Sequence, residues 1–549
     1  MKLKKNTFIQ GAFIATMGIV ISKILGIIYV IPLHAIIGEQ GGALYGYAYN
    51  IYSIFLGISQ AGVPLAMSRL ISEYNTLGYY GDKEKIFKVG RTFLNVVGII
   101  CFLILFFFAP QIADLIIGGV TDGNSPEDIA LVIRVISTAI LIVPILSVSR
   151  GYLQGHRFIA PTSTSQIIEQ VVRVVIIIIG SYVSVKVFHL PLSIAVSCAV
   201  FAATLGAISS YVYLRIKIKN NKKELNMESV CEEPKLTNMD IMKMIMIYAV
   251  PLILIELFRS IYNSVDIVML VRTLHNDFGF ATRDAEAVMS YISTYGAKLN
   301  NIIISVVAGL MTSLIPNLTR SIVKKDKKDI NAKINQTFQI ILGISLPMSI
   351  GLSFLTDLVW NVFYGTSKYG PVTFKILVFI AFATTVFSAC MTVAQLLKEY
   401  KVVYGGLVAG FLFKLFLNIP MMHLFNNMGL LPFYGSITTS ILGFLISSLL
   451  CLTYCAIKYK INLMPTFKVG GKILIGVLLM VGSMYLLHIL GLPLAVENRM
   501  ISLAIAIFYA GVGGIVYLAF MQATKSVEDI FGTENVDRIK KKLAKFKLR

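Results

Sequence analysis

The chain has 549 residues, of which 56% are hydrophobic and only 14% are charged. A soluble globular protein has a smaller apolar fraction and more charge, so this composition excludes that class. Apolar runs of about 20 residues, the length that crosses a bilayer core, recur along the whole sequence. The sequence therefore predicts an all-α, polytopic membrane protein.

The apolar runs predict about 14 transmembrane helices. In chain order they are 8–37, 43–66, 92–118, 129–149, 160–184, 190–214, 244–271, 287–316, 336–364, 372–397, 402–424, 432–457, 470–491 and 498–521. The first run is too long for the apolar part of a signal peptide and contains Lys23, so we interpret it as a retained helix. An even number of spans places both termini on one side of the membrane.

The net charge is +21, and the basic residues are distributed unevenly between the two sides of the predicted topology. The outer loops and their edges contain only five basic residues, which are Lys186, Arg272, Arg283, Lys368 and Arg499. Such an imbalance is the positive-inside pattern, and it predicts a multi-pass protein of the bacterial plasma membrane with both termini in the cytoplasm. The basic excess is explained by orientation and by anionic membrane lipids, and we expect no nucleic-acid partner.

A long polar linker separates six spans from eight, and the two sides resemble each other. The stretch RTFLNVVGIICFLILFFFAPQIADLIIGG from Arg91 resembles QTFQIILGISLPMSIGLSFLTDLVWNVFYG from Gln336. We interpret this as two six-helix lobes in a parallel pseudo-two-fold repeat, plus two extra C-terminal helices. The predicted parts are an N-lobe (1–216), a cytoplasmic linker (217–240), a C-lobe (241–460), helices 13 and 14 (461–521) and a basic amphipathic cytoplasmic tail (522–549).

Two lysines lie in the middle of apolar spans. Lys23 is in GIVISKILGIIYVIP and Lys298 is in SYISTYGAKLNNIIISVVAGL. A lysine at mid-bilayer costs about 2.5–3.5 kcal/mol on insertion scales, and neither residue has an acid at helical spacing in its own span. A water-filled cavity that attracts anions accounts for both, with an acid from another helix as the alternative.

Other intramembrane charges come in groups. Glu256, Arg259 and Asp266 share one face of the seventh span, because their spacings are three and seven residues. Glu169 and Arg173 are one turn apart in the fifth span and form a mainly structural pair, while Lys414 fits either role. The acids are candidate sites for a coupling cation.

Signatures of enzymes are missing from the sequence. It contains no GxxxxGK[ST] loop for ATP, its six histidines are dispersed, and its six cysteines are scattered. The outer loops are too short for a catalytic domain. We therefore expect a protein that is not an enzyme, has no cofactor and no metal site, and uses sodium or a proton as its coupling cation.

Three stretches resemble the polysaccharide-transport branch of the multidrug/oligosaccharidyl-lipid/polysaccharide (MOP) exporter superfamily, which includes MurJ-type lipid II flippases and SpoVB/YtgP-like proteins. They are GEQGGALYGYAYNIYSIFLGISQAGVPLAMSRLISEY, SRGYLQGHRFIAPTSTSQIIEQVVRV and TYGAKLNNIIISVVAGLMTSLIPNLTR. The resemblance covers nearly the whole chain. It implies an alternating-access fold with two lobes around a central cavity.

The resemblance also implies which residues bind substrate. MurJ-type proteins line their cavity with cations for the substrate's pyrophosphate, and Lys23 and Lys298 match the positions of two family arginines. Lysine keeps the charge but loses the bidentate phosphate geometry of arginine. A further family arginine and a family acid have no clear counterpart near Leu44 and Ile51, and Glu39 is the nearest carboxylate. The expected substrate site comprises Lys23, Lys298, Arg259, Ser22, Asn263 and Gln60.

These features predict a monomeric flippase for an undecaprenyl-pyrophosphate-linked sugar, with lipid II as the first candidate. The alternatives are another lipid-linked precursor, of capsule or spore cortex, and an ion-coupled multidrug exporter. An exporter of organic cations should have an acidic cavity, whereas the intramembrane charges here are mainly basic. A membrane potential or ion gradient is expected to drive transport because the sequence lacks an ATP site.

Overall fold

The computed structural model describes residues 8–60, 62–118, 120, 122–225 and 234–531, and these ranges contain helices and no strands. The predicted all-α membrane fold is confirmed. The chain forms two compact units, Met1–Lys298 and Leu299–Arg549. The predicted basic tail falls largely outside the described residues, and the lobe boundaries stay predictions.

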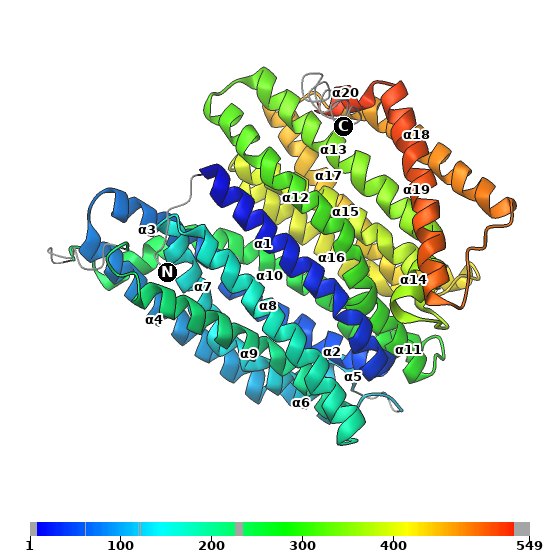
Figure 1. Cartoon of the computed structure of the whole chain (residues 1–549), viewed down its shortest axis with the longest axis horizontal. Helices are drawn as coiled ribbons and strands as arrows, with labels where there is room; N and C mark the ends of the chain where they lie inside the picture. Colours follow the sequence, from blue (N-terminus) through cyan, green and yellow to red (C-terminus); the bar gives the residue numbers. More distant parts are fainter. Residues whose placement is uncertain (1–7, 61, 119, 121, 226–233, 532–549) are drawn as a thin grey trace, which may run out of the picture. The chain divides into compact units, whose positions relative to one another are not determined.

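Unit 1 contains the first eleven α-helices and two π-helical turns (Figure 1). Their bounds are α1 Phe8–Ile28, α2 Val30–Gln60, α3 Val63–Thr76, α4 Tyr80–Phe107, α5 Ala109–Ile117, α6 Pro126–Ser137, α7 Ala139–Gly155, α8 Ile159–Tyr182, η1 Val183–Val187, α9 Leu192–Lys219, α10 Asn238–Asn276, α11 Thr282–Ser290 and η2 Tyr291–Tyr295.

Unit 2 begins within α12 and continues to the last described helix. Its bounds are α12 Gly296–Val323, α13 Lys327–Phe354, α14 Thr356–Tyr364, α15 Gly370–Leu396, α16 Tyr400–Asn427, α17 Phe433–Tyr459, α18 Met464–Ile489, α19 Arg499–Ala523 and α20 Ser526–Phe531.

The predicted count of 14 spans is not confirmed. Among the described residues, 11 helices are long and apolar enough to cross a membrane, or up to 12 if one bent pair is a single span. The bent pair is Ile21–Ile28 with Val30–Gly57, which meet at 44°. Gly38 then leaves the helical conformation (φ 62°, ψ −160°), at the turn expected between the first two spans. A positive φ strains residues with a Cβ, so glycine suits this break.

The two stretches that resemble each other in sequence fold alike. The first begins within the 28-residue helix α4 and continues through the 9-residue helix α5. The second begins within α13 and continues through α14, and these helices have the same lengths of 28 and 9 residues. A single residue separates the helices in each pair, Phe108 in one and Leu355 in the other. Equal lengths and an equally placed break support the predicted repeat.

Within unit 1, α2 is the central helix of the part that carries the site. It packs against α10, α11, α6 and α9, while α1 lies along α8 and α8 lies along α9 (Figure 1). The start of α10 is fixed by a capping box, in which Thr237 and Asp240 satisfy each other's backbone N–H groups. These contacts bring α1, α2, α8 and α10 together.

Both described ends of the linker are tied to the start of α4. The Lys83 ammonium donates to the Leu225 carbonyl at 2.6 Å, and the Lys85 ammonium donates to the Leu236 carbonyl at 2.6 Å. The Leu236 N–H in turn donates to the Asp82 carboxylate at 2.9 Å. The approach to α10 is therefore held against unit 1.

In unit 2, α16 and α17 pack closely near the turn that joins them. A Cβ added to Gly435 would lie 2.4 Å from the carbonyl carbon and oxygen of Met421, which belong to the backbone of α16. Backbone atoms cannot rotate away from such a clash. Gly435 is therefore required by the distance between the two helices.

We expect Gly435→Ala to destabilise unit 2 by about 1–3 kcal/mol, because the added methyl group must push α16 and α17 apart. Thermal unfolding of the purified protein in detergent measures the effect. Gly405→Ala is the matched control, since Gly405 is on α16 and exposed, with open space around its Cβ position. An equal loss of stability in both variants would contradict this account.

Candidate functional site

Four tyrosines form a cluster inside unit 1. Tyr45, Tyr49 and Tyr52 share one face of α2, and Tyr29 lies between α1 and α2. The rings of Tyr45 and Tyr49 are stacked with centroids 5.5 Å apart, and Tyr49 meets Tyr52 edge-on at 5.7 Å. The hydroxyls of Tyr29 and Tyr45 are 3.4 Å apart. Tyr49 is partly exposed, whereas the other three are buried, so it forms the accessible side of the cluster.

Lys298 extends over this tyrosine cluster. Its Nζ lies 5.3 Å from the centroid of the Tyr29 ring and 5.9 Å from that of Tyr49. Such cation–π contacts contribute about 0.5–2 kcal/mol each, but they leave the charge itself uncompensated. Within the described part of the chain Lys298 makes no ion pair. The π-helical turn η2 ends three residues before it, and such turns are frequent at functional sites.

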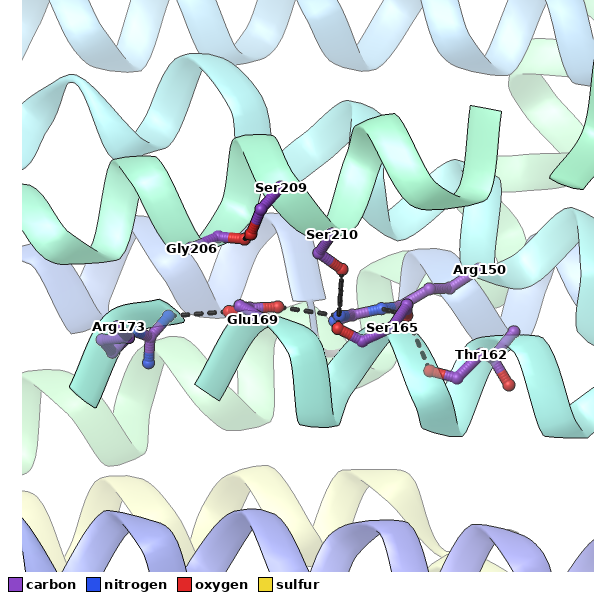
Figure 2. A network of polar contacts seen from close by, with 8 residues as sticks. All are labelled: Arg150, Thr162, Ser165, Glu169, Arg173, Gly206, Ser209 and Ser210. Carbon is purple, nitrogen blue, oxygen red and sulfur yellow. Dashed lines mark hydrogen bonds and ion pairs between the residues drawn. The ribbon is translucent and has the colours of Figure 1, made fainter. Parts of the chain in front are cut away.

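Arg173 belongs to a largely buried charged network with Arg150 and Glu169 (Figure 2). It also lies within electrostatic range of the tyrosine cluster. The Glu169 carboxylate accepts a hydrogen bond from Arg150 at 2.7 Å and another from Arg173 at 2.7 Å. Arg150 is on α7, so the sequence pairing of Glu169 with Arg173 found only half of the network. The network has two guanidinium groups and one carboxylate, which leaves a net charge of +1.

A second group of charges lies on α1 and α10. Lys23 is half-buried and lies within electrostatic range of Arg259. Both side chains are positively charged, so they repel each other. Arg259 is exposed and contacts Glu256 at 3.5 Å. Ser22, beside Lys23, has a buried Oγ without a hydrogen-bond partner among the described residues. Lys23 itself makes no ion pair in the described part of the chain.

The remaining predicted site residues lie in varied surroundings. Asn263 is exposed on α10, and Asp266 is buried on the same helix. Gln60 is the last residue of α2, and its side chain lies outside the described residues. Lys414 is buried within unit 2, on α16. Thus unit 1 brings Lys298 and Arg173 to one tyrosine cluster, and these assignments of function stay predictions.

The sequence did not reveal the contacts that two carboxylates, Glu39 and Glu286, make near α11 and η2. Glu39, after the break in α2, accepts a hydrogen bond from Tyr291. Glu286 is fully buried and accepts bonds from the backbone N–H and the side-chain amide of Asn124, at 3.0 and 2.9 Å. Both contacts join segments distant in the sequence, so no local pattern could have found them.

Unit 2 contains an apolar cavity of about 430 Å³ between α13, α18 and α19. Its lining is almost wholly apolar and includes Gly343, Pro347, Met348, Met480, Met484 and Gly514. Flexible methionines and small glycines make a wall that adapts to a chain-like apolar ligand. The hydrophobicity of these spans did not distinguish this cavity from lipid-facing surface.

Comparison with known proteins identifies the family. Residues 8–322 match the family model described as Polysaccharide biosynthesis protein. The chain belongs to this family. It is 32% identical over 530 residues to the lipid II flippase MurJ of Bacillus subtilis (strain 168), covering 93% of this chain and 94% of that protein. Stage V sporulation protein B of the same organism is 23% identical over 66% of this chain and 68% of its own. The predicted membership in the polysaccharide-transport branch is confirmed.

Solved structures of this superfamily share the fold. One is a lipid II flippase MurJ in an inward closed conformation, with a TM-score of 0.62 and 17% identity, covering 93% of this chain and 98% of that one. Another is an inward-facing multidrug resistance MATE family transporter of the MOP superfamily, with a TM-score of 0.64 and 12% identity over 80% and 94%. The MATE transporter aligns with 80% of this chain, whereas the MurJ structure aligns with 93%.

The buried carboxyl of Glu286 predicts a pH-dependent stability. Burial raises the pKa of Glu286 from 4.5 to about 7, against the opposing effect of the Asn124 hydrogen bonds. The folded protein then holds a proton that the unfolded chain releases above pH 4.5. The contribution is fully present below that pH and is lost as the pH rises through about 7.

We therefore expect the unfolding temperature to fall between about pH 5 and about pH 8, and to fall less in Glu286→Gln, whose amide does not ionise. Unfolding followed in detergent across this range gives both curves. Glu497→Gln, which changes an exposed acid, is the control. Parallel curves for the wild type and Glu286→Gln would show that another group causes the pH dependence.

Proposed function

We propose that this protein is a flippase that moves lipid II, an undecaprenyl-pyrophosphate-linked sugar, from the inner to the outer leaflet of the bacterial plasma membrane. The observation that carries the proposal is the pair of lysines, Lys23 and Lys298, held in unit 1 without a carboxylate partner among the described residues. The 32% identity to a lipid II flippase over nearly the full length of both chains favours lipid II over other lipid-linked sugars.

The chemistry of the site suits a pyrophosphate. Attraction between ammonium groups and a phosphate is strong where the effective dielectric constant is low, and it falls steeply where water screens it. The tyrosine rings below Lys298 attract its charge without neutralising it. Lys298 therefore remains able to bind an anion, while the partly exposed Tyr49 offers a flat apolar face to the adjoining sugar.

The apolar cavity of unit 2 suits the isoprenoid part of the substrate. Its wall offers almost no polar atoms that would have to be desolvated by a hydrocarbon chain. The substrate's two chemical parts, an anionic head and an apolar chain, thus correspond to two separate features of the protein. Alternating access would expose the head-group site first to one side of the membrane and then to the other.

The drive we propose is a membrane potential or an ion gradient, with sodium or a proton as the coupling cation and Asp266 or Glu256 as its candidate site. Glu169, the third acid expected from the sequence, is paired with two arginines and is less suited to a cation. We also propose that the protein acts as a monomer and as a transporter, without catalysing a reaction. A flippase for another lipid-linked precursor is the second candidate, favoured by the similarity to a sporulation protein over two thirds of the chain.

Lys23→Ala with Lys298→Ala should reduce transbilayer movement of fluorescent lipid II in proteoliposomes by about tenfold or more, because the phosphate loses its charged partners. Lys375→Ala is the matched control, since Lys375 is an exposed lysine on α15 of unit 2. Wild-type rates in the double variant would assign a structural role to both lysines and contradict the proposed cavity.

Gly514→Leu should fill the apolar cavity and slow the flipping of lipid II that carries the full-length isoprenoid chain, while sparing an analogue with a short chain. Gly514 lines the cavity and has open space at its Cβ position, so the larger side chain enters the cavity without a backbone clash. Gly511→Leu, exposed on the same helix, is the control. Equal slowing of both analogues would place the chain elsewhere.

A further inference from the structure

The Arg150–Glu169–Arg173 network has more positive charge than its carboxylate can balance. Both guanidinium groups lie 2.7 Å from Glu169, one on each carboxylate oxygen. Arginine does not lose its proton in proteins, so the network keeps a net charge of +1 in every state in which Glu169 is ionised. All three side chains are largely buried, with exposed fractions of 10–15%. A buried excess charge is expensive unless something binds it.

The two arginines differ in how fully they are hydrogen-bonded (Figure 2). Arg150 donates to Ser165 through Nε at 3.1 Å, and through one terminal nitrogen to Glu169 at 2.7 Å and Ser210 at 3.0 Å. The two serines are themselves fixed, since each donates to a backbone carbonyl of α8. Arg150, on α7, is therefore held in one position by side chains of two other helices, α8 and α9.

Arg173 has no comparable set of partners. It donates to Glu169, and its buried Nε has no hydrogen-bond partner among the described residues. The groups within its electrostatic range include Glu169 and the hydroxyls of all four tyrosines of the cluster. Arg173 thus adjoins the same tyrosine cluster over which Lys298 lies. Two cations from different helices share one aromatic surface.

We propose that Arg173 binds the phosphate or pyrophosphate group of the substrate, and that Arg150 is a positioning residue which keeps Glu169 neutralised when Arg173 turns to that anion. Without Arg150, binding an anion at Arg173 would leave a buried carboxylate unpaired, which is strongly unfavourable. With Arg150 in place, Glu169 keeps a charged partner throughout. The network therefore presents one arginine to the ligand and retains the other.

This inference rests on the proposed function and extends it. It adds an arginine, with its planar and bidentate geometry, to a site whose two other candidate cations are lysines. The bidentate contact between an arginine and a phosphate would then be made by Arg173, on α8. The same chemistry fits a free phosphate or a phospholipid head group, so the test has to separate these sources.

The test measures the affinity of the purified full chain for farnesyl pyrophosphate, a soluble probe with both chemical parts of the substrate. Inorganic pyrophosphate and phosphatidylglycerol are tested alongside it, and farnesol controls for the apolar chain. We expect Arg173→Gln to weaken farnesyl pyrophosphate binding by about tenfold or more. Lys375→Gln controls for the loss of one intramembrane positive charge.

The charge balance gives a pattern that a purely structural network would not give. Arg150→Gln should also weaken binding about tenfold, although Arg150 does not touch the ligand, because Glu169 then neutralises Arg173. Adding Glu169→Gln to Arg150→Gln should restore the affinity, whereas adding it to Arg173→Gln should not. Glu169→Gln alone should raise the affinity, since the network's charge rises from +1 to +2.

The outcomes separate the two proposals when lipid II flipping by the wild type is measured in parallel. If the wild type flips lipid II but Arg173→Gln binds the probe normally, or Glu169→Gln abolishes binding, this inference is wrong and the proposed function stands. If the wild type neither flips lipid II nor prefers farnesyl pyrophosphate over farnesol, both are wrong. Tighter binding of inorganic pyrophosphate or phosphatidylglycerol would overturn the lipid-linked sugar as the source of the anion.

Discussion

The central constraint on this molecule is uncompensated positive charge held inside an apolar helix bundle. Lys23, Lys298 and one arginine of the α7–α8 network each carry charge that no carboxylate of the described residues balances. Burial of a lone cation is among the most expensive features that a fold can contain. The surrounding structure reduces this cost in different ways, with aromatic faces under Lys298 and a shared carboxylate at Arg173.

The use of tyrosine around these cations follows from the same constraint. A tyrosine ring attracts a cation through its electron-rich face, and its hydroxyl can accept a hydrogen bond without adding a formal charge. Replacing the cluster by carboxylates would neutralise the site, and replacing it by aliphatic residues would leave the cations unsupported. The α2 face with Tyr45, Tyr49 and Tyr52 is an intermediate solution that stabilises positive charge while leaving it available.

Hydropathy and charge predicted the all-helical membrane fold, because single spans are local features. The repeat was also visible, and α4–α5 and α13–α14 have the same lengths. The contacts that build the site could not be predicted from the sequence, since they join helices that are distant along the chain. Helical spacing pairs Glu169 with Arg173, but only the packing of α7 against α8 supplies Arg150. Among the described residues 11 helices, or up to 12 with the bent pair around Tyr29, meet the length and hydropathy of a span, so the predicted 14 is not confirmed. The bend itself depends on packing and had no local hydropathy signal.

The attachment of the linker to α4 has a practical consequence. Because Leu225 and Leu236 are both hydrogen-bonded to the first two turns of α4, the chain between them starts and ends beside the same end of one helix. Lengthening such a closed segment costs little conformational entropy and does not pull on the helices it joins. A fluorescent protein or an epitope inserted between these two anchors should leave the bundle undisturbed, which offers a site for labelling the protein in living cells.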